Sequence, residues 1–203
     1  MGEPLLRGSR LEKRYGAVRA LAPVDILVEA GRTVAVTGPS GSGKSTLACI
    51  LAGLERPDAG EVWRAPGLVS QLVFQDAAAT LNPRFTALEI VREPLDISRA
   101  RGRDARALAL MEQVGIPREA ACRKPHQFSG GQRQRLAVAR ALAMEPRLLI
   151  LDEALSGLDL SIQAQLLNLL ADLQERHGLG YVFITHDPAV AAHVASQILE
   201  MPA

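Results

Sequence analysis

The chain of 203 residues has few cysteines and almost no net charge, and both scarcities exclude classes of function. Its two cysteines, Cys49 and Cys122, are too few and too far apart in the sequence to form a metal site. Cys49 falls in an apolar helical stretch, which favours a buried, reduced thiol of the kind found in the cytoplasm. The formal net charge of +1 leaves no strongly basic face, so we expect no nucleic-acid partner.

Long apolar runs are missing as well. No uninterrupted apolar stretch approaches the roughly 18 residues that a membrane-spanning helix requires. The first ten residues, MGEPLLRGSR, lack the apolar core of a signal peptide, so we expect a chain that is made in the cytoplasm and stays there. Its length and its 48% of apolar residues suit one compact domain, 1–203, with an inserted subdomain.

Segments typical of buried strands alternate with segments typical of helices. Helices are expected at about 44–54, at 161–178 and at 187–195. Strands are expected at TVAVTG (33–38), EVWRA (61–65), LVSQLVF (68–74), RLLILDE (147–153) and YVFITH (181–186). This alternation predicts an α/β fold with a parallel sheet.

Residues 76–130 differ in character, because apolar residues recur there at helical spacing, as in RDARALALMEQVGI. We predict a helical subdomain over 76–130, inserted into an α/β core made of 1–75 and 131–203. The arginine-rich stretch RARGRDAR (99–106) within the insertion is interpreted as a solvated loop, with a docking patch as the alternative.

The stretch GPSGSGKS (38–45) follows a strand and opens a helix, which is the context that a phosphate-binding loop requires. Its glycines let successive backbone N–H groups turn towards an anion, and the helix N-terminus adds its positive end. Lys44 supplies a point charge to the outer phosphates, and the Ser45 hydroxyl can ligate Mg²⁺. The alternative, a glycine-rich turn with an incidental lysine, is disfavoured by the complete pattern.

Polar residues follow two of the apolar strands. Asp152, at the tip of LLILDE, can hold the water shell of Mg²⁺ opposite Ser45. Glu153 can orient and deprotonate an attacking water, although the two acids can instead cap the next segment. His186 follows YVFIT and either touches a terminal phosphate and the catalytic water or is a solvated strand end.

The stretch FSGGQRQR, which begins at Phe128, contains a second candidate anion site. Ser129 and Gln132 fit a capping box, in which the two side chains satisfy the first amides of a helix. Gly130 and Gly131 expose N–H groups that side chains would otherwise cover, which favours an anion. Because the chain already has a phosphate-binding loop, we infer that this helix start serves the nucleotide of another subunit.

Together these segments resemble the nucleotide-binding subunits of ABC transporters. FSGGQ matches that family's signature motif, GPSGSGKS and LLILDE resemble its Walker A and Walker B segments, and SGLD (156–159) resembles its D-loop. Gln75 fits the Q-loop glutamine and His186 the switch histidine. Tyr15 sits where the family stacks an aromatic ring on adenine, with a strand-edge tyrosine as the alternative.

The resemblance implies a fold, two cofactors and a set of site residues. The implied fold is a P-loop NTPase (RecA-like) core with a mainly parallel sheet, an N-terminal antiparallel β region and an inserted helical subdomain that carries the signature motif at its end. The implied cofactors are ATP and Mg²⁺. The implied catalytic residues are Glu153, His186 and Gln75, and the implied metal ligands are Ser45, Gln75 and Asp152. The implied nucleotide-binding residues are Tyr15, Gly38, Pro39, Ser40, Gly41, Ser42, Gly43, Lys44, Ser45, Thr46, Ser129, Gly130, Gly131, Gln132, Asp152 and Asp159.

A finer resemblance, in LVFQDAAATLNPRFT, is to the ATPases of dipeptide, oligopeptide and nickel importers. It implies three kinds of partner: a second ATP-binding subunit, identical or homologous, polytopic membrane permease subunits, and an extracytoplasmic solute-binding protein. The chain would then lie in the cytoplasm, peripheral on the inner face of the cell membrane. The alternatives are a soluble ABC-type ATPase outside transport and a non-hydrolysing scaffold subunit, as in phosphonate-degrading complexes; intact Lys44, Asp152, Glu153 and His186 count against the scaffold.

Overall fold

The computed structural model describes residues 2–202, and the chain divides into two compact units. The first unit comprises Met1–Leu72, Arg147–Glu153 and Ala171–Ala203, and the second comprises Val73–Pro146 and Ala154–Leu170. The second unit is larger than the predicted helical subdomain, because it includes two further segments, helix α5 (Gly130–Leu142) and Ala154–Leu170. The subdomain boundaries therefore stay a prediction.

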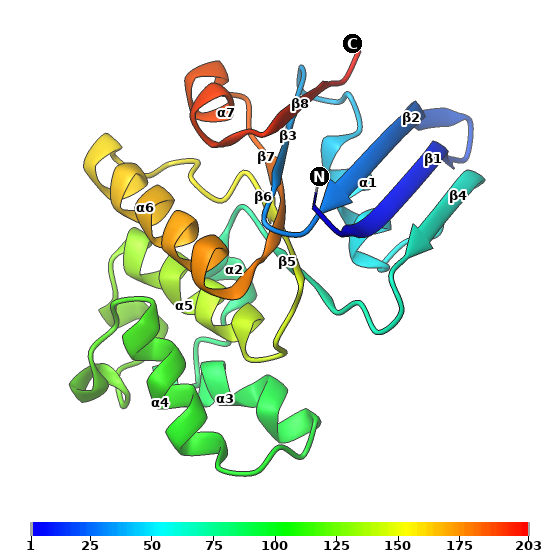
Figure 1. Cartoon of the computed structure of the whole chain (residues 1–203). Helices are drawn as coiled ribbons and strands as arrows, with labels where there is room; N and C mark the ends of the chain where they lie inside the picture. Colours follow the sequence, from blue (N-terminus) through cyan, green and yellow to red (C-terminus); the bar gives the residue numbers. More distant parts are fainter. Residues whose placement is uncertain (1, 203) are drawn as a thin grey trace. The chain divides into compact units, whose positions relative to one another are not determined.

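The first unit contains an antiparallel sheet with the strand order β2-β1-β4 (Figure 1). It is formed by β1 (Pro4–Tyr15), β2 (Val18–Glu29) and β4 (Ala59–Arg64). β1 and β2 make a hairpin whose turn begins at Gly16, where φ is +60°, a conformation that glycine adopts without strain. The strand expected at 61–65 corresponds to β4 of this antiparallel sheet.

The second sheet of this unit has the order β5-β6-β7-β3-β8, with parallel pairing of β3 to β7 and β8 and of β6 to β7. The strands are β3 (Thr33–Thr37), β5 (Ser70–Val73), β6 (Leu148–Asp152), β7 (Gly180–Ile184) and β8 (Gln197–Glu200). Every residue of β6 and β7 is buried, which explains why both read as continuous apolar runs. Because the strands are parallel, β3, β6 and β7 end at one edge of the sheet, and the predicted site residues follow these ends.

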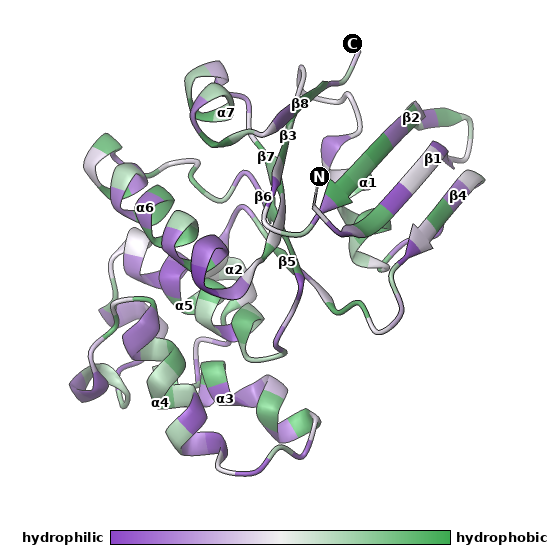
Figure 2. Ribbon diagram, in the orientation of Figure 1, coloured by the Kyte–Doolittle hydropathy of each residue, from purple (hydrophilic) through white to green (hydrophobic). Residues whose placement is uncertain are grey.

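An apolar core holds helix α1 (Lys44–Ala52) in place. Leu47, Ile50 and Leu51 of the helix cluster with strand residues that colour green in Figure 2. Complete burial of such a side chain contributes about 1.5–3 kcal/mol.

Helix α7 (Pro188–Val194) is capped by Asp187, whose carboxylate accepts a hydrogen bond from the Ala189 amide at 2.8 Å.

The second unit is built from helices α2 (Ala77–Thr80), α3 (Ala87–Ile97), α4 (Arg103–Gln113) and α5, with 3₁₀ turns at Arg118–Ala120 and Pro125–Gln127. α5 packs against α2, α3 and α4. α3 begins with a capping box, in which the Thr86 hydroxyl accepts from the Glu89 amide and the Glu89 carboxylate accepts from the Thr86 amide. Helix α6 (Leu160–His177) begins in this unit and ends in the first.

Two further observations bear on the sequence predictions. Across residues 2–202, none of the helices combines the length and the apolarity needed to cross a bilayer. Both cysteines are free thiols; Cys49 is partly buried and Cys122 is exposed. Burial raises the pKa of the Cys49 thiol above its usual value, so the neutral thiol is favoured.

Candidate functional site

The loop between β3 and α1 has the backbone that a phosphate cradle requires. Gly38 and Gly43 have φ values of +146° and +94°, which disfavour any residue with a side chain. A Cβ on Gly43 would lie 2.3 Å from the Ala20 oxygen, and one on Gly38 would lie 2.7 Å from the Met201 oxygen. Only glycine fits at these two positions, and the bare amides of the loop lead directly into the N-terminus of α1.

Lys44 and Ser42 give this loop polar groups that suit a phosphate. Lys44 is only 7% exposed, and its Nζ donates to the Gly38 oxygen at 2.9 Å and the Pro39 oxygen at 2.7 Å. The Ser42 hydroxyl is buried and has no hydrogen-bond partner among the described atoms. A buried ammonium beside a buried hydroxyl without a partner fits an anionic ligand, because a phosphate oxygen accepts from both.

Asp152 ends β6 beside the start of α1, where its carboxylate accepts a hydrogen bond from the Ser45 hydroxyl. The carboxylate is 8% exposed, and burial raises its pKa; the Ser45 bond and the Lys44 charge act in the opposite direction. The two predicted Mg²⁺ ligands in this unit are thus in contact. Hydroxyl and carboxylate oxygens are ligands that Mg²⁺ prefers, so this pair fits the metal.

Glu153 and His186 meet at the same edge of the sheet. The Glu153 carboxylate lies 3.7 Å from His186 Nδ1, and the Glu153 amide donates to the Ile184 oxygen at 3.1 Å. Glu153 has a φ of +48°, a strained conformation for a residue with a side chain, at a cost of about 1–3 kcal/mol. This backbone turns the glutamate out of β6 and towards the histidine, whose side chain is 66% exposed.

The signature segment forms the start of α5 in the second unit. The Ser129 hydroxyl accepts from the Gln132 amide at 3.3 Å, and the Gln132 side chain accepts from the Ser129 amide at 3.0 Å. The structure therefore contains the predicted capping box. Helix geometry leaves the amides of Gly130 and Gly131 without an intrahelical acceptor, and Gly130 is exposed.

A turn over residues 155–158 contacts these glycines. The Leu158 side chain lies 3.5 Å from where a Cβ of Gly130 would be, and Ile162 of α6 lies 2.3 Å from the corresponding point on Gly131. Asp159 caps α6 through a bond from the Ile162 amide at 3.0 Å. The turn, the start of α6 and the signature segment are therefore packed together within one unit.

Two glutamines hold the turn. Gln75 Nε2 lies 3.5 Å from the Ser156 hydroxyl. Gln163 Nε2 donates to the carbonyl oxygens of Leu155 and Leu158, at 3.2 and 3.1 Å. The sequence analysis missed Gln163, because no pattern connects a helical glutamine with the carbonyls before its helix. The magnesium role of Gln75 stays a prediction.

Tyr15 lies at the end of β1 in the first unit and is 50% exposed. Lys13, which the sequence analysis did not single out, has its Nζ 5.6 Å from the centroid of the Tyr15 ring. The sequence did contain a signal for this pair, because Lys13 and Tyr15 are two residues apart and such residues on a strand project from the same face.

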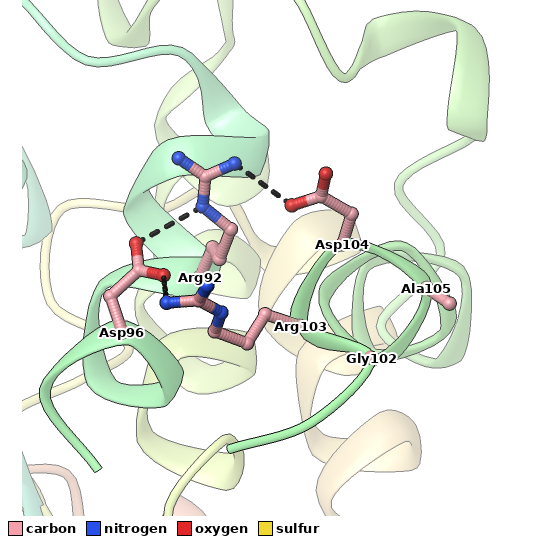
Figure 3. A pocket seen from close by; sticks show the side chains of 6 residues that line it. All are labelled: Arg92, Asp96, Gly102, Arg103, Asp104 and Ala105. Carbon is pink, nitrogen blue, oxygen red and sulfur yellow. Dashed lines mark hydrogen bonds and ion pairs between the residues drawn. The ribbon is translucent and has the colours of Figure 1, made fainter. Parts of the chain in front are cut away.

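A cavity of about 510 Å³ between α3 and α4 lies away from all of these motifs in the sequence (Figure 3). Arg92 bridges Asp96 at 3.1 Å and Asp104 at 2.8 Å, and Arg103 pairs with Asp96 at 2.9 Å. The charges that line it neutralise one another. Arg103 belongs to the arginine-rich stretch, and residues 103–106 of that stretch form the first turn of α4 rather than the expected loop.

Comparisons with known proteins identify the family of the chain. The family model described as "ABC transporter" matches residues 21–156. The chain is 46% identical to the probable D,D-dipeptide transport ATP-binding protein DdpF of Escherichia coli K12, over 96% of this chain and 65% of the relative. It is 41% identical to the dipeptide transport ATP-binding protein DppF of the same organism, over 98% of this chain and 68% of the relative. The chain thus spans about two thirds of the length of these relatives.

A solved structure provides the comparison of folds. It is the dimeric post-hydrolysis state of the ATP-binding cassette MJ0796 bound to ADP and Pi, with a TM-score of 0.83 and 33% identity over 97% of this chain and 94% of the cassette. This likeness confirms the predicted α/β fold with its parallel and antiparallel sheets. The family model covers more than half of the chain, and it includes the phosphate-binding loop, Asp152, Glu153 and the signature segment. The chain therefore belongs to the ABC transporter family.

Proposed function

We propose that this chain binds and hydrolyses ATP as the nucleotide-binding subunit of an ABC transporter. The observation that carries the proposal is the cluster at the edge of the parallel sheet, where Lys44 and Ser45 open α1 and Asp152 and Glu153 lie at the end of β6. The 33% identical cassette that was solved with ADP and Pi supports hydrolysis.

Each residue of the cluster has a defined task. Lys44 and the loop amides bind the β- and γ-phosphates, and Ser45 and Asp152 hold Mg²⁺, directly or through its water. When bound, Mg²⁺ neutralises charge that develops on the phosphate oxygens. Glu153 accepts a proton from the water that attacks the γ-phosphorus, and the bond from that phosphorus to the bridging oxygen breaks to give ADP and phosphate.

His186 and Tyr15 complete the nucleotide site on their own chain. His186, held beside the Glu153 carboxylate, orients the water and contacts the terminal phosphate. Tyr15 stacks on the adenine ring, and its half-exposed ring fits that task.

The signature segment serves the nucleotide of a partner subunit. Its helix start, where Ser129, Gly130 and Gln132 are exposed, offers hydroxyl, amide and side-chain donors for a γ-phosphate. Leu158, from the turn before α6, lies against it, and Asp159, which caps α6, belongs to the same interface with the partner subunit. The dimeric state of the similar cassette supports this assembly of two shared sites.

The experiment for this function is phosphate release from Mg-ATP by the purified chain. We expect turnover by the wild type, none after removal of Mg²⁺ with EDTA, and none for Lys44→Ala, which removes the charge on the phosphates. Lys124→Ala, which removes an exposed lysine of the second unit, is the matched control and should hydrolyse normally. Hydrolysis by Lys44→Ala at the wild-type rate would contradict the proposal.

We further propose that the transported solute is a peptide, nickel or a similar small solute. The names of the relatives, which are dipeptide transport ATP-binding proteins, support this class over a soluble ATPase or a scaffold. The partners are polytopic permease subunits and an extracytoplasmic solute-binding protein, with this chain on the inner face of the membrane. Purification of the tagged chain from membranes should recover permease subunits, whereas recovery from the soluble fraction alone would favour the other classes.

A further inference from the structure

Lys13 and Tyr15 form a pair on one face of β1. Lys13 Nζ is 5.6 Å from the centroid of the Tyr15 ring, within the range of a cation–π interaction. The lysine side chain is 13% exposed, whereas Tyr15 is 50% exposed. A lysine side chain that is mostly covered therefore holds its ammonium near a half-exposed aromatic ring.

The ammonium of Lys13 is fixed by the loop that joins α1 to β4. It donates to the Arg56 oxygen at 2.8 Å and to the Asp58 carboxylate at 3.2 Å, and the Glu55 carboxylate lies at 3.4 Å. Asp58 also accepts from the Arg14 amide at 2.8 Å, which holds the strand between the two members of the pair. The bond to Asp58 raises the pKa of Lys13 above its usual value, so the side chain stays protonated at neutral pH.

The hairpin that carries this pair packs on the phosphate-binding loop. Lys13 pairs with Leu21 across the ladder between β1 and β2. The Ala20 oxygen and the Leu21 Cα lie 2.3 and 3.2 Å from where a Cβ of Gly43 would be. Tyr15 is therefore on a hairpin in direct contact with the loop that precedes Lys44, within the first unit.

We propose that Lys13 is a positioning residue for the nucleotide base. Its ammonium holds one face of the Tyr15 ring and withdraws π-electron density from it, which leaves the opposite face to stack on the electron-rich adenine. Lys13 acts through the ring and does not touch the nucleotide. The inference rests on the proposed function, in which this unit binds ATP.

The test compares two probes by calorimetric titration. Mg-ATP has the phosphates and the base, whereas Mg-tripolyphosphate has phosphates alone. Lys13→Met keeps the length of the side chain and removes its charge, so it should weaken ATP binding about two- to fivefold. The same variant should bind tripolyphosphate as the wild type does. Lys124→Met, which changes net charge equally, should leave both affinities unchanged.

A double-mutant cycle separates action through the ring from direct attraction. Tyr15→Leu should weaken ATP binding, and Lys13→Met/Tyr15→Leu should be no weaker than Tyr15→Leu alone. Lys13→Arg, which keeps a cation and its donors, should restore the preference for ATP over tripolyphosphate.

Losses that add in the double variant would overturn the inference, and so would equal weakening of both probes by Lys13→Met. Melting curves check folding, and Lys13→Gln, which can still donate to Arg56, replaces Lys13→Met with the same outcomes if that variant does not fold. A wild type that binds tripolyphosphate with the same affinity as ATP would also overturn it, because the base would then contribute nothing to binding. A wild type that binds neither probe would instead refute the proposed function.

Discussion

The phosphate-loop end of the first unit and the signature segment of the second unit are built differently. At the first, Lys44 and Asp152 are buried, and Glu153 meets His186 across two strand ends. At the second, an exposed helix start uses Ser129 and Gln132 to cap itself. The first region combines a cation, metal ligands and a base, whereas the second offers hydrogen-bond donors alone.

This difference indicates which unit carries out which part of the proposed function. Ser, Gly and Gln side chains cannot deprotonate water at neutral pH, so the signature segment can recognise a phosphate but cannot hydrolyse it. The first unit has the groups for hydrolysis: it buries Lys44 and Asp152 and leaves His186 exposed. We infer that the chemistry lies in the first unit and that the second unit contributes recognition to a partner's site.

The largest expected effect is on the chemistry of the first unit. Glu153→Gln keeps the size of the side chain but removes the base, so hydrolysis should slow by at least about a hundredfold. Mg-ATP binding should stay nearly normal, because Lys44, Ser45 and Asp152 are unchanged. Single-turnover phosphate release and equilibrium titration measure the two quantities. Near-normal turnover would reassign the base, with His186 as the next candidate.

The next largest effect is on the coupling of ATP hydrolysis to solute transport. Gln75 contacts Ser156 in the turn that lies against Gly130, so its loss should disturb this turn and the signature segment within the second unit. Gln75→Ala should reduce transport several-fold more than basal hydrolysis. The measurement is solute uptake per ATP hydrolysed in reconstituted vesicles that contain the permease. Uptake per ATP equal to that of the wild type would remove Gln75 from coupling.

A matched pair of glycine substitutions tests the packing of the signature segment. A Cβ on Gly131 would lie 2.3 Å from Ile162, whereas one on Gly130 would make ordinary contact with Leu158 at 3.5 Å. Gly131→Ala should lower the free energy of unfolding by about 1–3 kcal/mol, and Gly130→Ala should not. Urea denaturation measures both. Adding Ile162→Ala to Gly131→Ala should relieve the overlap, and equal stabilities of the two single variants would contradict the packing.

The smallest expected effect is on stability near the metal ligands. Because burial raises the pKa of Asp152, the folded chain holds this proton more tightly than the unfolded chain does. Its ionisation therefore costs stability as pH rises from the usual pKa through the raised value. Asp152→Asn should raise the melting temperature of the nucleotide-free protein by roughly 2–5 °C at pH 7.

The control for this prediction is the pH series. The rise in melting temperature caused by Asp152→Asn should shrink at lower pH, because the wild-type carboxyl is then protonated and also uncharged. The same variant should lose Mg²⁺-dependent hydrolysis, because an amide is a poor replacement for a carboxylate ligand. A variant that melts below the wild type at pH 7 would show that the ionised carboxylate stabilises the fold.

The sequence predicted the parallel sheet of the first unit better than the antiparallel sheet of the same unit. β3, β6 and β7 are short and buried, so each reads as an apolar run, and the motif residues directly follow them. By contrast, the alternation pattern did not reveal β1 and β2. Their exposed and buried residues alternate irregularly, and their pairing shifts register at several points, so no clean period of two is visible.

Contacts between distant segments were beyond the sequence. The packing of Leu158 against Gly130 and of Ile162 against Gly131 depends on tertiary structure rather than on local pattern. The left-handed backbone of Glu153 is likewise imposed by its surroundings, because glutamate has no intrinsic preference for it.

The central claim is that each ATP site is shared between two chains, with Lys44 from one and the signature segment from the other. Gly130→Asp tests it cleanly, because the structure leaves room for a side chain at Gly130 and an acidic residue suits a helix start. The variant should fold, yet its carboxylate should repel the γ-phosphate. Gly130→Asp and Lys44→Ala should each be inactive when they pair with themselves.

The decisive measurement is the ATPase activity of mixed pairs, formed from differently tagged Gly130→Asp and Lys44→Ala chains that can pair with each other. If sites are shared, one site of a mixed pair carries both lesions and the other is wholly wild type. The account predicts that activity absent from both parents appears on mixing. Mixed pairs that form but stay as inactive as their parents, or a Gly130→Asp chain that is fully active alone, would contradict it.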